Sequence, residues 1–217
     1  MANRTLYFPK LKRRAKYSIF TSYRQYRQEI REDCQGRCVY CDVHENEIGG
    51  QEFMTLDHFR PKDKYTGLQH DPTNLLWSCT ICNSSKANCW PAYGSTKTHV
   101  KRRGFVDPFS EDLHGYFDVA ADGSLIALKH PSTFMINRLK LNRTGAKRVR
   151  AKRRVTYEER ELRIAYLVRA LTHVDNLLDR CSDLPEDFEA DLQAHREELC
   201  RLLELAQADP TPDFTLR

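Results

Sequence analysis

The chain has 217 residues, of which 40% are hydrophobic and 30% are charged. This composition is typical of a folded protein that buries a core, and it excludes a disordered chain. No apolar run approaches the roughly 20 residues that a membrane-spanning helix needs. The basic N-terminus also lacks the apolar segment of a secretory signal, so the sequence predicts a cytoplasmic protein with no membrane partner.

The charge is divided unevenly along the chain. Up to Tyr157 there are 28 Lys and Arg residues against 15 Asp and Glu residues, and from Glu158 on there are 7 against 15, for a net charge of +5. The basic part predicts a polyanionic partner, because contacts with phosphates supply most non-specific affinity for nucleic acids. The acidic part would repel phosphates, so it predicts a role other than binding nucleic acid.

In chain order, the first predicted elements are a basic, extended arm over residues 1–17 and a helix over residues 21–36, with a capping residue at its start and glycine at its end. A short strand is expected over residues 53–56 and a second over residues 75–78. The run TICNSSKANCW, residues 80–90, is expected to begin a helix.

The second half of the chain is predicted to be a hairpin followed by helices. Two apolar segments flank Asp122-Gly123, which is a strong signal for a tight turn between strands. From Ser132 the apolar spacing becomes helical, and Pro185 breaks the pattern. A last helix is expected over residues 186–208.

Four of the eight cysteines form two Cys-x-x-Cys pairs, Cys38 with Cys41 and Cys79 with Cys82, which are separated by about 37 residues. Four thiolates are the tetrahedral ligand set that Zn²⁺ prefers, and such a site is closed to water, so the zinc would be structural. The alternative is a redox pair with two bystander thiols. Zinc is favoured, because the second pair repeats the first and neither follows a pattern of alternating strands and helices.

The polar residues around these pairs occur in the order Asp57-His58, Asn74, Asn83 and Lys86. Together with both cysteine pairs and Pro61, this order and spacing resemble the HNH endonuclease family, in the type whose ββα-metal core is held by a four-cysteine zinc. The resemblance covers roughly residues 34–90, which is under half of the chain.

The resemblance implies a role for each of these residues in hydrolysing a phosphodiester bond. His58 would be the general base, since a neutral imidazole with a pKa near ~6.5 suits the activation of water. Asp57 and Asn83 would supply oxygen ligands to one catalytic Mg²⁺ or Mn²⁺. Asn74 would not bind the metal and would instead hold the loop that orients His58. Asn83 stands where many relatives carry histidine.

Each of these residues also has an ordinary structural explanation. An Asp-His pair is usually a solvated turn. An Asn beside a strand or a Cys-x-x-Cys turn is usually a turn residue or a helix cap. All of these residues occur together, in the family's order, around two cysteine pairs that are predicted to bind zinc. This combination favours the catalytic interpretation. We interpret His44, His70 and His99 as surface residues, with an approach of His70 to the metal as the alternative.

Two groups of basic residues are predicted to contact the backbone of double-stranded DNA, with RNA as the alternative. Arg60, Lys62 and Lys86 lie beside the motif. The stretch from residue 138 to residue 154 carries nine basic residues and no acidic one. A charged helix face is usually only solvated, but this excess favours phosphate contacts. The predicted contacts in the stretch are Arg143, Lys147, Arg148 and Arg150.

The flanking segments resemble, more weakly, the HNH nucleases that are encoded beside ATPases in bacterial anti-phage defence, as in Septu systems (the PtuB-like group) and some retrons. This resemblance implies that the acidic C-terminal helices dock onto an ATPase partner or onto a second copy of the chain. The alternative is a helical hairpin that simply covers the core.

The sequence therefore predicts an α+β fold, in which a zinc-stapled ββα-metal core carries an N-terminal helix, a β-hairpin insertion and a C-terminal helical region. The expected segments are residues 1–33, 34–95, 96–131 and 132–217. The predicted function is that of a metal-dependent HNH endonuclease in defence. The alternatives are a restriction or mobile-element nuclease and a non-catalytic zinc-organised module that binds nucleic acid or acts as a scaffold.

Overall fold

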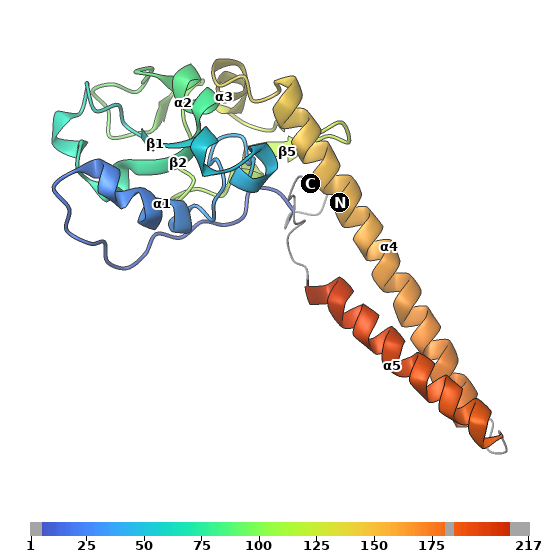
Figure 1. Cartoon of the computed structure of the whole chain (residues 1–217). Coiled ribbons are helices and arrows are strands. Elements are labelled where there is room, and N and C mark those ends of the chain that lie inside the picture. Colours follow the sequence, from blue (N-terminus) through green and yellow to red (C-terminus); the bar gives the residue numbers. More distant parts are fainter. Residues whose placement is uncertain (1–5, 181–184, 209–217) are drawn as a thin grey trace. The chain divides into compact units, whose positions relative to one another are not determined.

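The two strands beside the Asp-His pair form one small antiparallel sheet. In the computed structural model, which describes residues 6–180 and 185–208, β1 (Met54–His58) pairs with β2 (Leu75–Cys79) (Figure 1). In this pairing His58 lies opposite Leu75. Every residue of β2 is buried, because its sequence LLWSC offers side chains of low polarity to both faces. Helix α2 (Thr80–Lys86) begins directly after β2. Both predicted strands and the helix after them are confirmed.

The predicted N-terminal helix is shorter than expected and begins with a tighter turn. A 3₁₀ turn, η1 (Tyr23–Tyr26), precedes α1 (Arg27–Asp33). Ser22 accepts a hydrogen bond from the Arg24 amide, and its own amide donates to the side chain of Gln25. This reciprocal capping fixes the first turn. The helix ends at Asp33, three residues before Gly36.

A short ribbon, a hairpin and a helix follow the ββα segment. The predicted hairpin around Asp122-Gly123 is confirmed by β5 (Phe117–Val119) and β6 (Leu125–Ala127), which pair antiparallel. A second ribbon, β3 (His99–Val100) with β4 (Arg103–Gly104), was not predicted, because two-residue strands leave no alternating pattern to detect. Helix α3 (Ser132–Arg138) then leads to the start of α4. The remaining 3₁₀ turns are Glu45–Ile48, Gln51–Phe53, Thr66–Leu68, Pro72–Asn74 and Leu113–Gly115.

Contacts among the described residues divide the chain into two compact units, and the first ends at Lys152. Its core is one continuous apolar cluster that includes Trp77, Phe105, Leu139 and Leu141, each fully buried. The cluster draws on the arm before η1, the ββα segment, the hairpin and α3. The mixture of helices and short strands confirms the predicted α+β class.

The second unit, which begins at Arg153, is helical. It contains the rest of α4 (Thr144–Arg180) and the whole of α5 (Glu186–Ala208), and the predicted bounds of the last helix are confirmed. Leu167 and Val174 of α4 pack with Leu199 of α5 in a small core. None of the helices that the structure describes has the length and apolar composition of a membrane span.

The turn between β5 and β6 presses against the first turns of α4. Gly123 has a φ of +78°, and a Cβ atom there would lie 2.0 Å from the carbonyl oxygen of Lys147. Arg150 donates from Nε to the carbonyl oxygen of Gly123 at 2.7 Å, which keeps the two segments in contact. The turn therefore needs glycine both for its backbone conformation and for space.

We expect Gly123→Ala to destabilise the protein by more than about 2 kcal/mol, because it adds left-handed backbone strain to a severe clash. Gly145→Ala is the matched control, since a Cβ at Gly145 meets no atom within 4 Å. Gly145 lies in the first turn of α4, where alanine is neutral or slightly stabilising. Thermal unfolding of both variants tests this, and equal midpoints would contradict it.

Candidate functional site

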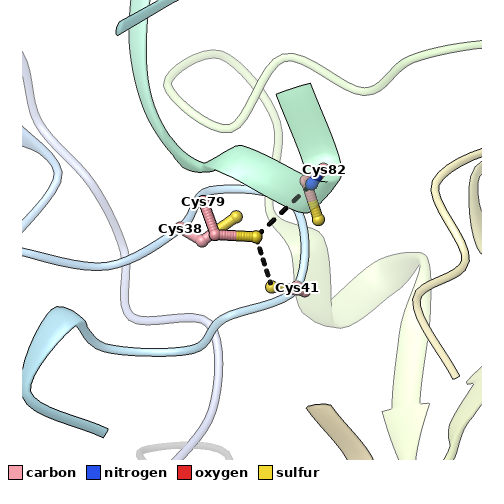
Figure 2. Close-up of side chains that lie close together, drawn as sticks. All are labelled: Cys38, Cys41, Cys79 and Cys82. Carbon is pink, nitrogen blue, oxygen red and sulfur yellow. Dashed lines mark hydrogen bonds between the residues drawn. The ribbon is translucent and has the colours of Figure 1, made fainter. Parts of the chain in front are cut away.

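The four predicted cysteine ligands meet at one point. The sulfur atoms of Cys38, Cys41, Cys79 and Cys82 all lie within 4.8 Å of one another, and all four residues are buried (Figure 2). The sulfurs of Cys41 and Cys79 are 3.8 Å apart. A tetrahedral site with Zn–S bonds of about 2.3 Å separates its sulfurs by about 3.8 Å. The cluster therefore fits zinc, and the gathering of all four sulfurs favours zinc over the redox alternative, which would need only two of them.

Two tight turns build this cluster. In the first, the Asp42 amide donates to the carbonyl oxygen of Cys38 at 2.8 Å, and Asp42 has a positive φ of 63°. In the second, Cys79 is the N-cap of α2, and its sulfur accepts from the amide of Cys82 at 3.4 Å. The helix N-terminus thus directs an amide at a thiolate, which favours the charged form that metals bind.

His58 is the last residue of β1, and its ring is oriented by a backbone carbonyl. Its Nε2 lies 2.9 Å from the carbonyl oxygen of Gln69. A carbonyl only accepts, so Nε2 carries the proton in the neutral ring and Nδ1 holds a lone pair. None of the described residues hydrogen bonds to Nδ1. Burial lowers the pKa of His58, although the Gln69 carbonyl and the charge of Asp57 oppose this shift. The ring is therefore held as a neutral proton acceptor.

Asp57 is buried and paired with a cation. Its carboxylate accepts from the hydroxyl of Tyr40 at 2.5 Å and lies 3.0 Å from Nζ of Lys86. Burial raises the pKa of Asp57, while Lys86 and Tyr40 oppose the shift. Lys86 also donates to the carbonyl oxygen of His58 at 2.7 Å, and its side chain is 0% exposed. This placement corrects the predicted phosphate contact of Lys86, because its ammonium lies inside the fold.

Asn74 holds the loop that orients His58. Its Oδ1 accepts from the amide of Arg60 at 2.9 Å, and its Nδ2 donates to the carbonyl oxygens of Arg60 and Leu68. Leu68 directly precedes Gln69, whose carbonyl binds the imidazole. Buried Asn74 thus connects the two sides of the loop on which the orientation of His58 depends.

Asn83 and Lys86 lie three residues apart on α2, so they share a face of that helix. Lys86 on this face reaches Asp57, which brings Asn83 to the same side of the sheet as the carboxylate. Asn83 is half-buried, and its side-chain amide has no hydrogen bond to the rest of the described chain. A carboxylate and an amide oxygen are the hard ligands that Mg²⁺ and Mn²⁺ take.

The two predicted cations that follow His58 behave differently. Arg60 donates to the carbonyl oxygens of Ser95 and Thr96, which occupies its guanidinium in holding a loop. The ammonium of Lys62 lies 5.4 Å from the centre of the Tyr23 ring. That ring packs edge-on against His58, with 4.8 Å between the ring centres. Lys62 therefore lies beside the site, and the phosphate contacts of both cations stay predictions.

The basic stretch is mostly engaged within the fold. Arg150 is 0% exposed and donates to the carbonyl oxygens of Cys41, Gly123 and Leu141. The predicted DNA contact of Arg150 is therefore wrong, because the first turns of α4 direct this side chain inward. Lys147 pairs with Asp122 at 2.6 Å and helps to lower the pKa of that carboxyl to about 2.

Arg148 is exposed, so its DNA contact stays a prediction. The guanidinium of Arg143 lies against the cysteine cluster, which assigns it a neighbour that the sequence did not indicate. Among the histidines, His70 is exposed, and His44 caps a 3₁₀ turn through Nδ1.

Sequence reasoning missed two residues of the site, Tyr40 and Tyr23. Tyr40 lies inside the first Cys-x-x-Cys pair, where any residue type is compatible with the turn. Tyr23 belongs to η1, far from the motif in sequence. Neither position carries a spacing signal, because both reach the site only through tertiary packing.

A protein with a ββα segment, a closed four-sulfur cluster and a strand-end histidine has the architecture expected of an HNH nuclease domain. Residues 38–88 match the family model described as HNH endonuclease, which confirms the resemblance over that range. The same region is similar to the Septu protein PtuB of Bacillus thuringiensis, with 42% identity over 50 residues. That alignment covers 23% of this chain and 19% of the relative's length. No solved structure matches the chain.

We expect the purified chain to contain one zinc ion, and Cys41→Ser to lose it and to unfold at a lower temperature. The reason is that a structural zinc contributes its binding energy to folding. Cys200→Ser is the matched control, because Cys200 lies in α5 outside the cluster. Metal analysis with thermal unfolding tests this. Equal zinc content in the two variants would contradict the assignment.

We also expect His58 to titrate below the ordinary histidine pKa of about 6.5. Below that pH the unfolded chain takes up a proton that the folded chain does not, so this group costs stability as the pH falls towards the folded pKa. An NMR titration of the imidazole signals, with His58→Gln to assign the resonance, measures it. A midpoint at or above 6.5 would contradict the burial argument.

Proposed function

We propose that the chain is a metal-dependent HNH endonuclease that hydrolyses phosphodiester bonds in DNA, with His58 as the general base. The observation that carries the proposal is the state of His58. Its Nε2 is bonded to the carbonyl oxygen of Gln69, which leaves the lone pair of Nδ1 to accept a proton. The family match over residues 38–88 supports the same reaction class.

In the proposed reaction, the attacking water gives its proton to Nδ1 of His58 as its oxygen bonds to phosphorus. Nε2 keeps its hydrogen bond to Gln69, so the charged ring stays oriented and is stabilised by that carbonyl. Asn74 acts indirectly by fixing the loop that presents the carbonyl. Hydrolysis is complete when the bond from phosphorus to the leaving 3′ oxygen breaks: that oxygen keeps the bonding electrons and takes a proton from solvent, and His58 returns its proton to solvent.

Asp57 and Asn83 are the residues that we propose to hold the catalytic Mg²⁺ or Mn²⁺. When bound, such an ion supplies charge stabilisation to the phosphate oxygens and to the leaving oxygen. A carboxylate offers about four acceptor positions, so Asp57 keeps capacity beyond its bonds to Tyr40 and Lys86. Asn83 offers an amide oxygen with no other partner among the described residues.

Lys86 sets a condition on that binding. Its buried ammonium already compensates the charge of Asp57 at 3.0 Å and opposes a second cation there. A phosphate of the substrate would add the negative charge that removes this opposition. We therefore infer that the divalent ion binds together with the nucleic acid and only weakly to the free chain.

The biological role that we propose is that of an effector nuclease in bacterial defence. The similar relative is named as a Septu protein, which supports this role over that of a restriction or mobile-element nuclease. We further propose that the acidic first turn of α5, with Glu186, Asp187 and Glu189, belongs to a surface that docks an ATPase partner or a second copy. An ATPase gene beside this gene would favour the ATPase partner.

Nicking of supercoiled plasmid in Mg²⁺ or Mn²⁺ tests the enzymatic function. We expect His58→Ala to lower the rate by about 10²–10⁴-fold, the usual contribution of a general base. His195→Ala is the matched control, because His195 is an exposed residue of α5 in the second unit. If the wild-type chain is as inactive as His58→Ala, even with candidate partners added, the non-catalytic alternative replaces the proposal.

A further inference from the structure

Arg143 lies against the sulfur cluster in a way that nothing in the sequence motif requires. Its Nη2 is 3.3 Å from the sulfur of Cys79 and 3.4 Å from that of Cys41. Its Nη1 is 3.6 Å from the sulfur of Cys82. One guanidinium therefore contacts three of the four predicted zinc ligands, and these three belong to both Cys-x-x-Cys turns.

The charge of the cluster explains why a cation belongs there. Four thiolates around one Zn²⁺ carry a net charge of −2, and the four cysteines are buried. A buried charge is costly unless it is paired and hydrogen bonded. Arg143 brings one positive charge, and its N–H groups donate to sulfurs that otherwise have few donors.

The geometry also explains the choice of arginine. A guanidinium is a planar fork with five N–H donors in fixed directions, so its two terminal nitrogens reach different sulfurs at once. A lysine ammonium is a point charge, and it would contact fewer sulfurs. Arg143 therefore brings a positive charge and N–H donors to sulfurs of both Cys-x-x-Cys turns at once.

The backbone around Arg143 connects this contact to the start of α4. The carbonyl of Arg143 accepts from the amide of Lys147, so the residue stands at the start of α4. Arg150 is seven residues further on, on the same helix face, and donates to the carbonyl oxygen of Cys41. Arg143, which directly precedes α4, and Arg150 of α4 thus bind Cys41 at its sulfur and at its backbone.

We propose that Arg143 is a positioning residue of the structural zinc site: its guanidinium hydrogen bonds to the thiolates of Cys41, Cys79 and Cys82, offsets their charge and couples α4 to the metal. This role does not depend on the proposed nuclease activity. It also takes Arg143 out of the set of predicted DNA contacts.

Zinc release from the purified full-length chain to a chromophoric chelator tests the proposal. Replacing residues that orient metal ligands usually lowers metal affinity about 10–100-fold. We expect Arg143→Met to lose zinc affinity to this extent and to release zinc correspondingly faster than the wild type. Arg143→Lys should fall between the two, because it keeps the charge and loses the fork. Arg148→Met is the matched control, since it removes a cation from the exposed face of the same helix.

Cobalt substitution gives a second readout that is independent of release kinetics. The thiolate-to-Co²⁺ charge-transfer band should shift in Arg143→Met and not in Arg148→Met. The reason is that hydrogen bonds to the sulfurs lower the energy of the sulfur lone pairs. Wild-type release and an unshifted band in Arg143→Met would overturn the proposal. If Arg143→Met does not fold, Arg143→Lys decides the question, and release at the wild-type rate by that variant would overturn the proposed fork.

Discussion

The fold of the first unit depends on one constraint, the meeting of four cysteine sulfurs from two distant turns. Cys38 and Cys41 precede the small sheet, while Cys79 and Cys82 mark the passage from β2 into α2. A sheet of two five-residue strands is marginal by itself. Structural zinc contributes about 10–16 kcal/mol in small zinc-finger peptides, which is enough to hold such a segment together. The cluster thereby fixes the direction in which β1 ends and α2 begins.

The positions of the candidate catalytic residues depend on this cluster through a series of contacts. Because β1 ends at His58, the imidazole lies at the end of the strand, where the loop that follows can return to it. The carbonyl of Gln69 in this loop fixes the ring, and Asn74 fixes the loop. The ion pair of Asp57 with Lys86 joins β1 to α2. Each of these contacts involves a residue that another contact holds in position. Together they give the short motif a defined geometry.

Arginine has two uses in this protein that composition does not distinguish. The stretch from residue 138 to residue 154 reads as a surface for phosphates, and Arg148 agrees with that description. Arg150 and Arg143 instead turn towards the cysteine cluster. Arg150 binds the carbonyl oxygen of Cys41, and Arg143 contacts the sulfurs of Cys41, Cys79 and Cys82. A buried cluster of thiolates with a net negative charge also needs a cation as a partner. Charge density along a sequence therefore predicts an anionic partner, but that partner can be part of the same chain.

The sequence by itself determined which four cysteines cluster, the two strands, the hairpin at Asp122-Gly123, the last helix and the family of the central segment. These features depend on local spacing: a turn between paired cysteines, a run of apolar residues, or a glycine at a positive φ. His58, Asn74 and Asn83 could be named for the same reason, since their order is part of a motif.

Only the tertiary structure decided what these residues touch. The tautomer of His58 depends on the carbonyl of Gln69, and the state of Asp57 depends on Tyr40 and Lys86. The side chains of Arg143 and Arg150 point inward because the start of α4 packs against the turn from Cys38 to Cys41. Such contacts join residues that are up to 109 positions apart. Spacing along a chain carries no information about them, because they arise only when the whole unit packs.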